Sequence, residues 1–167
     1  MSTSARSLTG APFDMGYVVY TGKVLSDAHK ANPNSPFRSA TLFATVFPNA
    51  GENLNHMPVV PAAEAYLREF PTGPFVVETS LTLAHFYDDL FKLLQSRIAG
   101  RSVWYKEDCF ARYVTTEPIT AQLRTAQQTG LAYYDRAAIE RRGDASIRAS
   151  RDALQRGRTS SWFFCHD

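Results

Sequence analysis

The sequence has little of what usually assigns a chain to a class. Its two cysteines, Cys109 and Cys165, lie far apart and form no CxxC pair. With four scattered histidines they match neither a disulfide framework nor a zinc site, so a reducing compartment suits them. No apolar run reaches the length of a membrane span, and the polar residues 1–10 contain no apolar core of a signal peptide. These absences predict a cytoplasmic protein with no membrane partner, no bound metal and no cofactor.

What is present has the proportions of an ordinary globular protein. The chain has 167 residues, of which 44% are hydrophobic and 20% are charged. That length predicts one domain, or one domain with an appendage. We expect a flexible arm over residues 1–12, an α/β core domain over 13–130 and a basic helical tail over 131–167.

A stretch near the middle of the chain decides the expected fold class. The apolar run that begins at Phe75 follows a proline- and glycine-containing turn, as a buried strand does. A helix is predicted over 82–99, where apolar residues recur at spacings of four and three, and Gly100 ends it. The run that ends at Tyr105 is rich in β-forming residues, so 75–105 is predicted to be a strand–helix–strand unit. The prediction is an α/β fold with a mixed sheet, followed by a C-terminal helical tail.

The flanking segments add further predicted elements. Strands are predicted over 17–20 and 40–47, where aromatic and β-branched residues are frequent. A helix is predicted over 61–70, with proline at the permitted first position, and a longer one over 120–142. Asp144 is placed to cap a last helix that ends near residue 156.

Charge is distributed unevenly along the chain. Residues 1–118 carry ten basic and eleven acidic residues, whereas 119–167 carry eight arginines, no lysine and five acids. Arginine binds phosphate with a planar fork and stacks on bases. Within 136–158 seven arginines face three acids, an excess of four positive charges. The predicted nucleic-acid-binding residues are Arg136, Arg141, Arg142, Arg148, Arg151, Arg156 and Arg158; the alternative is a solvated helix with mixed charges.

Three charged residues are the candidates for an enzyme's active site. In an open α/β sheet, ligands gather at the carboxyl ends of parallel strands. Glu78, Lys106 and Asp108 follow the two predicted strands, so they would meet there and could carry out acid–base or metal-assisted chemistry. The alternative is that residues 106–108 form only a charged turn.

Another acidic group lies on the predicted central helix. His85, Asp88 and Asp89 are three and four residues apart, so they can share one helix face. A His–Asp pair can bind a metal or tune a base. A solvated surface face is the preferred interpretation, because Asp88 and Lys92 make a good exposed ion pair.

A short polar sequence follows the first predicted strand. Thr21, Gly22 and Lys23 combine a hydroxyl, a backbone without Cβ and an ammonium, which together can bind phosphate. Residues 17–23 resemble the opening of BRCT-type domains, where a Thr/Ser–Gly pair ends the first strand. The predicted strand–helix–strand unit is compatible with that resemblance, whereas Trp104 does not stand where that family has its tryptophan.

The chain ends with an aromatic cluster. Trp162, Phe163 and Phe164 directly follow the basic segment, and exposed aromatic clusters commonly mark an interface. We therefore predict that they dock a protein partner. The alternative is that they fold back into a groove on the body, with Cys165 buried beside them.

The order of these parts suggests a function. A compact body to about Gly130, a basic segment over 133–158 and the terminal aromatics are similar in layout to the small packaging accessory protein in the polymerase complexes of cystoviruses, the double-stranded RNA phages. The resemblance implies RNA packaging, a place in the virion interior, an assembly partner and a possible homodimer. The expected function is that of a non-enzymatic accessory protein that contacts RNA or another polyanion. The alternative is a small enzyme that acts on a phosphorylated or nucleotide substrate at Glu78, Lys106 and Asp108.

Overall fold

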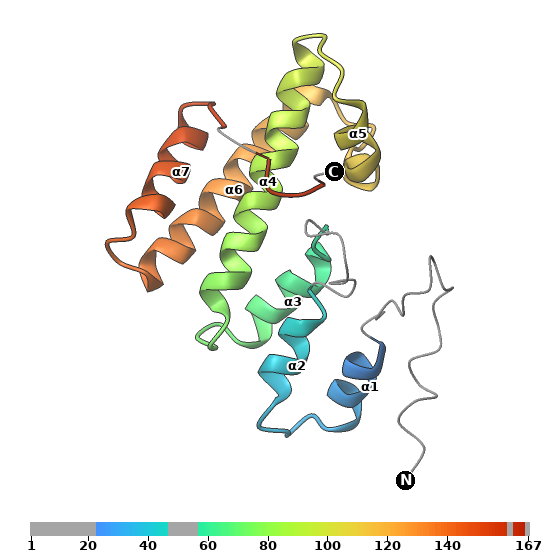
Figure 1. Ribbon diagram of the computed structural model, residues 1–167, viewed down its shortest axis with the longest axis vertical. Coiled ribbons are helices and arrows are strands. Elements are labelled where there is room, and N and C mark those ends of the chain that lie inside the picture. Colours follow the sequence, from blue (N-terminus) through green and yellow to red (C-terminus); the bar gives the residue numbers. More distant parts are fainter. Residues whose placement is uncertain (1–22, 47–56, 160–161, 166–167) are drawn as a thin grey trace. The chain divides into compact units, whose positions relative to one another are not determined.

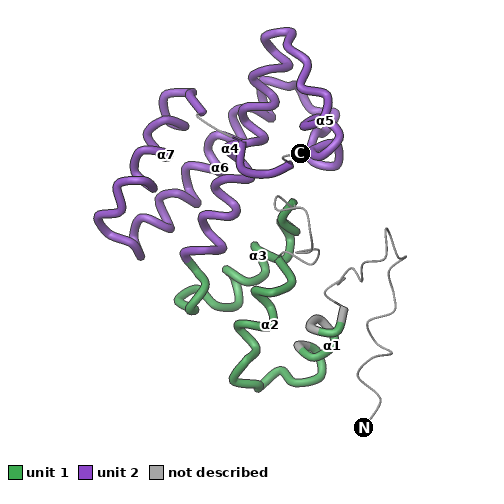
Figure 2. The backbone as a smooth tube through the Cα atoms, viewed as in Figure 1, with its two compact units in different colours: residues 1–76 green, residues 77–167 purple. Residues whose placement is uncertain are grey.

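The computed structural model describes residues 23–46, 57–159 and 162–165, and the regular elements in them are helices (Figure 1). These described residues contain no strand, so the predicted α/β fold with a mixed sheet is wrong. The strand–helix–strand unit with which the BRCT resemblance was compatible is therefore absent from them. The chain forms two compact units, residues 1–76 and 77–167 (Figure 2). Residues 131–167, predicted as a basic helical tail, belong to the second of these units.

The first unit contains three short helices, two of which pack through one aromatic side chain. They are α1 (Lys23–Ala31), α2 (Arg38–Ala44) and α3 (Val60–Glu69). Tyr66 on α3 is fully buried, and its hydroxyl accepts a hydrogen bond from the backbone N–H of Phe75 at 3.0 Å. The ring of Phe43 on α2 lies 5.9 Å from that of Tyr66 and stacks on Phe75 at 4.4 Å. Aromatic packing therefore joins α2, α3 and the residue that precedes the next helix.

The second unit is built around one long helix. Its elements are α4 (Val76–Ile98), α5 (Trp104–Phe110), the 3₁₀ helix η2 (Ala111–Tyr113), α6 (Ile119–Glu140) and α7 (Ala145–Gln155). Tyr87 on α4 stacks with Tyr133 on α6 at 6.0 Å, and Phe86 stacks with Phe110 on α5 at 5.4 Å. The central helix thus has a partner on two sides, as Figure 1 shows within this unit.

The predicted strands were wrong for a common reason. Residues 75–77 lead into α4, because Val76 continues the helical spacing of the apolar residues that follow. The run that ends at Tyr105 begins α5, and 40–47 overlaps α2. In each case β-branched and aromatic residues favoured a strand, but a strand needs a partner strand as well as propensity. The predicted strand at 17–20 lies outside the described residues.

The helices predicted from apolar periodicity are confirmed. The expected helices over 61–70, 82–99 and 120–142 correspond to α3, α4 and α6. Asp144 caps α7 as predicted, since its carboxylate accepts hydrogen bonds from the N–H groups of Ser146 (2.9 Å) and Ile147 (3.3 Å). Among the described helices, none is both long and apolar enough to cross a membrane.

Helices α6 and α7 form an antiparallel hairpin with a tight contact. The turn between them contains Gly143 at a φ of +93°, a conformation that glycine adopts without strain. Gly130 on α6 is buried, and a Cβ built there would lie 2.8 Å from Leu154 Cδ2 on α7 and 3.3 Å from Tyr87 Cβ on α4. The absence of a side chain at residue 130 therefore lets the three helices approach closely.

Candidate functional site

Four arginines in or beside α7 of the helical hairpin are exposed. Arg142 precedes α7, Arg148 and Arg156 lie on α7 or at its end, and Arg158 follows it, all of them exposed. We call these four residues the arginine surface. The other predicted nucleic-acid-binding arginines differ, because Arg141 and Arg151 are engaged within the protein and Arg136 is half-buried.

The packing of α7 explains why this surface faces solvent. Ile147 and Leu154, seven residues apart, are 3% and 0% exposed and form the face that packs on the hairpin. Arg148 and Arg156 do not belong to this packed face. They are about 12 Å apart along the helix axis at 1.5 Å per residue. The weak apolar stripe of this segment is thus sufficient to dock it, and the docking leaves the charged face free.

Four acids nearby are occupied by other groups, whereas Glu140 at the end of α6 is exposed. Asp144 caps α7, and Arg151 pairs with Asp135 at 2.8 Å and with Asp152 at 3.5 Å. Arg141 pairs with Glu78 at 2.7 Å. Within the described residues, no carboxylate forms a salt bridge with a member of the arginine surface. Its positive charge is therefore available to a ligand, and it adds to the field around the hairpin.

The three candidate catalytic residues do not come together. Glu78 lies in the first turn of α4 and is used by Arg141, whereas Asp108 on α5 is exposed. Lys106 is 9% exposed and donates to backbone carbonyls of the C-terminal segment. Lys106 lies beside Asp89 on α4. Asp89 is about 16 Å from Glu78 along the helix axis at 1.5 Å per residue, so Lys106 is far from Glu78. Without strands to align them, these residues form no common site.

The solvated face expected at His85, Asp88 and Asp89 is wrong, because Asp88 and Asp89 are 4% and 0% exposed. Burial raises the pKa of Asp88 to about 6. The hydrogen bond that Tyr134 Oη donates at 3.1 Å and the charge of Lys92 both lower this pKa, but burial has the larger effect. Burial lowers the pKa of His85 to about 4. These residues belong to the core of the second unit, and their side chains are used in packing.

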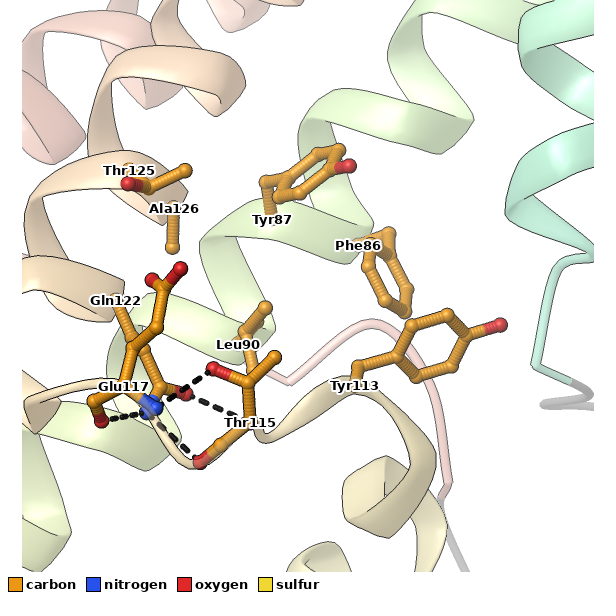
Figure 3. A pocket seen from close by; sticks show the side chains of 9 residues that line it. All are labelled: Phe86, Tyr87, Leu90, Tyr113, Thr115, Glu117, Gln122, Thr125 and Ala126. Carbon is orange, nitrogen blue, oxygen red and sulfur yellow. Dashed lines mark hydrogen bonds between the residues drawn. The ribbon is translucent and has the colours of Figure 1, made fainter.

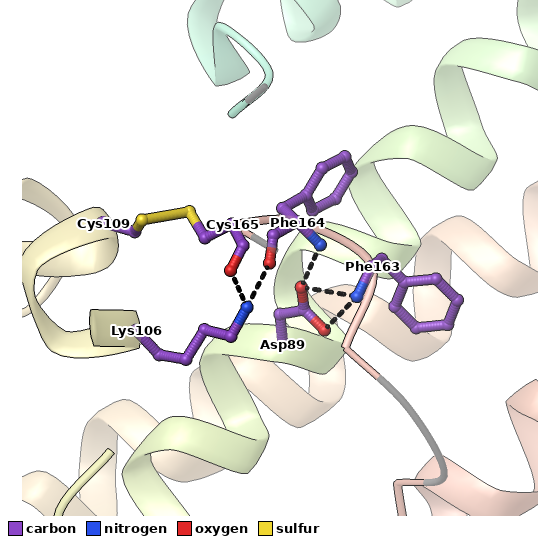
Figure 4. The surroundings of a disulfide bond; sticks show 6 residues. All are labelled: Asp89, Lys106, Cys109, Phe163, Phe164 and Cys165. Carbon is purple, nitrogen blue, oxygen red and sulfur yellow. Dashed lines mark hydrogen bonds between the residues drawn. A yellow bond between two sulfur atoms is a disulfide. The ribbon is translucent and has the colours of Figure 1, made fainter. Parts of the chain in front are cut away.

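Asp89 binds the end of the chain (Figure 4). Its carboxylate accepts hydrogen bonds from the N–H of Phe163 (3.0 and 3.1 Å) and from the N–H of Phe164 (2.9 Å). Burial raises the pKa of Asp89 to about 7, and the charge of Asp88 adds to this rise. The hydrogen bonds from the N–H groups of Phe164 and Phe163 and the charge of Lys106 lower the pKa, but burial has the larger effect. A buried carboxylate with donors from two successive residues fixes the backbone of this segment.

A second set of contacts fastens the same segment to α5. Lys106 Nζ donates to the carbonyl oxygens of Phe164, at 2.9 Å, and Cys165. Cys165 forms a disulfide with Cys109, across 56 residues of sequence (Figure 4). The two cysteines, whose spacing in the sequence suits a reducing compartment, are therefore joined to each other. We call the contacts of Asp89, Lys106 and Cys109 with residues 163–165 the C-terminal clasp.

The terminal aromatics pack within the second unit. Phe164 is 8% exposed, and the ring of Phe163 stacks on His85 at 3.8 Å. Trp162 lies under the ammonium groups of Lys92 and Lys106, at 4.7 and 5.3 Å from its ring centroid. Of the two arrangements considered for these residues, the structure has the intramolecular one, with Cys165 buried beside them.

The expected phosphate site can be placed only in part. Thr21 and Gly22 of the expected phosphate site lie outside the described residues, and Lys23 begins α1. No group of three or more histidines, cysteines, aspartates or glutamates in the described residues is arranged to bind a metal ion.

Comparison with protein-family models, curated proteins and solved structures finds no match.

The clasp is the feature that sequence reasoning missed, although one signal for it is present. Phe86 and Leu93, three residues before and four residues after Asp89, are both buried on α4. An acid between two core positions of one helix lies inside the apolar arc, and a buried acid needs donors. The pattern indicates that Asp89 is buried, but it does not say that its donors come from residues 163 and 164.

Proposed function

We propose that the protein is a non-enzymatic nucleic-acid-binding protein that contacts the phosphate backbone through the arginine surface. The observation that carries this proposal is that four exposed arginines lie on one hairpin without a carboxylate partner among the described residues. Arginine is suited to this contact because its planar guanidinium forms two parallel hydrogen bonds to phosphate. The packed face of α7 fixes the helix that carries Arg148 and ends at Arg156.

RNA is the nucleic acid to test first, because the layout resemblance to the cystovirus accessory protein implies it, although residues 131–167 belong to the second unit and form no separate tail. Contacts to phosphate carry no base information, so this surface alone gives binding with little sequence preference. An enzymatic function has less support, because Glu78, Lys106 and Asp108 are separated and two of them are engaged by other residues.

Fluorescence anisotropy of the full chain with a labelled single-stranded RNA tests the proposal. If all four arginines contact phosphates, the logarithm of the association constant falls with the logarithm of salt concentration with a slope of about −3. The variant R142Q/R148Q/R156Q/R158Q should lose most of the affinity measured at about 50 mM salt, and most of the slope.

A matched control removes four positive charges elsewhere. Lys30, Arg68, Arg101 and Arg112 are exposed and lie outside the arginine surface. K30Q/R68Q/R101Q/R112Q should weaken binding only modestly, through the change in net charge. Equal loss in both variants would mean that net charge and not the surface binds RNA, and an unchanged affinity in the first variant would contradict the proposal.

A further inference from the structure

A cavity lies between α4, the loop after η2 and α6, away from the C-terminal clasp. Its volume is about 170 Å³, and Figure 3 shows the side chains that line it. Phe86 and Tyr113 lie on one side, Glu117 on the opposite side, and Leu90 between them. A cavity of about 150 Å³ is sufficient to take one benzene molecule, so this one fits a ligand of about six to eight heavy atoms.

Aromatic rings make up much of the wall. The centroids of Phe86 and Tyr113 are 4.6 Å apart with the rings at 70°, and those of Phe86 and Tyr87 are 5.1 Å apart at 86°. The face of an aromatic ring carries negative electrostatic potential and attracts cations.

A carboxylate stands at the polar side of the cavity. The backbone before it is fixed, because Gln122 Nε2 donates to the carbonyls of Glu117 (2.6 Å) and Thr115 (3.0 Å), and Gln122 Oε1 accepts from the N–H of Thr115 at 3.0 Å. Glu117 is exposed, and no described lysine or arginine forms a salt bridge with its side chain. The cavity therefore combines a carboxylate, carried on a hydrogen-bonded backbone, with apolar and aromatic surface, and none of its described lining residues is basic.

We propose that this cavity binds a small organic cation of the alkylammonium class. The ammonium would lie between the Glu117 carboxylate and the faces of Tyr87 and Tyr113, with its alkyl groups against Leu90 and Ala126. A divalent metal ion fits less well, because such ions take six or more oxygen ligands and Glu117 is the only carboxylate that lines the cavity. The proposal is independent of RNA binding, which uses another part of the second unit.

A pair of isosteric ligands tests the proposal. Choline and its neutral analogue 3,3-dimethylbutanol have the same shape and differ in charge. In a heteronuclear NMR titration of the full chain, choline should shift the amides around Glu117 and Tyr113, and the analogue should bind at least about fivefold more weakly, as one cation–π contact of about 1 kcal/mol requires. Equal affinity of the two ligands, or shifts elsewhere, would overturn the proposal.

Two substitutions localise the effect. Glu117→Gln should weaken choline about fivefold and leave the neutral analogue unchanged, as expected for an exposed ion pair of about 1 kcal/mol. Glu140→Gln is the matched control, because Glu140 is exposed on α6 and does not line the cavity. Tyr113→Leu keeps an apolar wall but removes a ring, and it should also weaken choline selectively. If Glu117→Gln has no larger effect than Glu140→Gln, the assignment is wrong.

The alkylammonium group could belong to a free metabolite or to a methylated lysine of a peptide. A titration with a short peptide containing trimethyl-lysine, beside one with unmodified lysine, separates these sources. Preference for the trimethylated peptide over choline identifies a side chain as the ligand, and the reverse identifies a free cation. Failure of every cationic probe to bind better than its neutral or unmodified counterpart would contradict the alkylammonium class itself.

Discussion

Reduction of the Cys109–Cys165 disulfide should greatly destabilise the second unit. The bond closes a loop across 56 residues of sequence. The chain-entropy relation gives about 4 kcal/mol for a loop of that length, because the open chain regains conformations in its unfolded state. That amount is comparable with a large part of the total stability of a typical domain.

Urea unfolding with and without dithiothreitol measures this effect. Trp104→Phe leaves Trp162 as the single tryptophan, since the chain contains two, and Trp162 lies beside the clasp. With a urea dependence of about 2 kcal/mol per molar, a loss of about 4 kcal/mol moves the midpoint down by about 2 M. C109S/C165S should unfold at the reduced midpoint and should not respond to dithiothreitol.

An unchanged urea midpoint, with thiol titration showing complete reduction, would mean that the disulfide does not stabilise the second unit. The emission of Trp162 adds a second readout. The hydrogen bonds to Asp89 and Lys106 do not depend on the disulfide, so the segment should remain docked in the reduced native protein. A red-shifted, quencher-accessible signal before unfolding would show that these contacts are insufficient without the covalent bond.

Two further variants test the core of the second unit. The pKa of Asp89 is raised from 3.8 to about 7, so the folded protein binds its proton more tightly than the unfolded chain, and the stability this provides is lost as pH rises through 7. Between pH 4 and 7 the unfolding free energy of the unmodified protein should therefore fall by up to about 1.4 kcal/mol per pH unit, and Asp89→Asn should abolish this fall. Urea unfolding at several pH values measures both proteins, and identical pH profiles would show that Asp89 does not titrate in this range. Gly130→Ala should lower the unfolding free energy by about 1 kcal/mol or more, because the new Cβ would lie 2.8 Å from Leu154 Cδ2. This cost should exceed the gain from alanine's better helix propensity. A rise in thermal stability would contradict the tight contact.

The sequence predicts the long helices because their signal is local. The apolar residues of α4 and α6 recur at helical spacing over many turns, and Asp144 stands directly before its helix. The short elements were harder, because a few residues fit both periods. Val76 and Val77 satisfy a buried strand and the first turn of α4 equally well, and only the absence of a partner strand decides between them.

The clasp could not be derived in the same way, because it is a set of distant contacts. Asp89 meets Phe163 across 74 residues, and Cys109 meets Cys165 across 56. Sequence spacing says which residues share a helix face but not which segment covers that face. The arginine surface was easier to predict, since exposed charge requires no specific neighbour, although the ion pairs of Arg141 and Arg151 follow only from the fold.

The disulfide also changes what a break in the chain would do. Helices α6 and α7 both lie between Cys109 and Cys165, so the covalent structure there is a closed ring. A protease that cuts once inside this ring, for example after Arg142 in the turn, opens the ring but leaves the two pieces joined by sulfur. The hairpin that carries the arginine surface would thus stay attached to the rest of the molecule after such a cut, and only a reductant would separate the fragments.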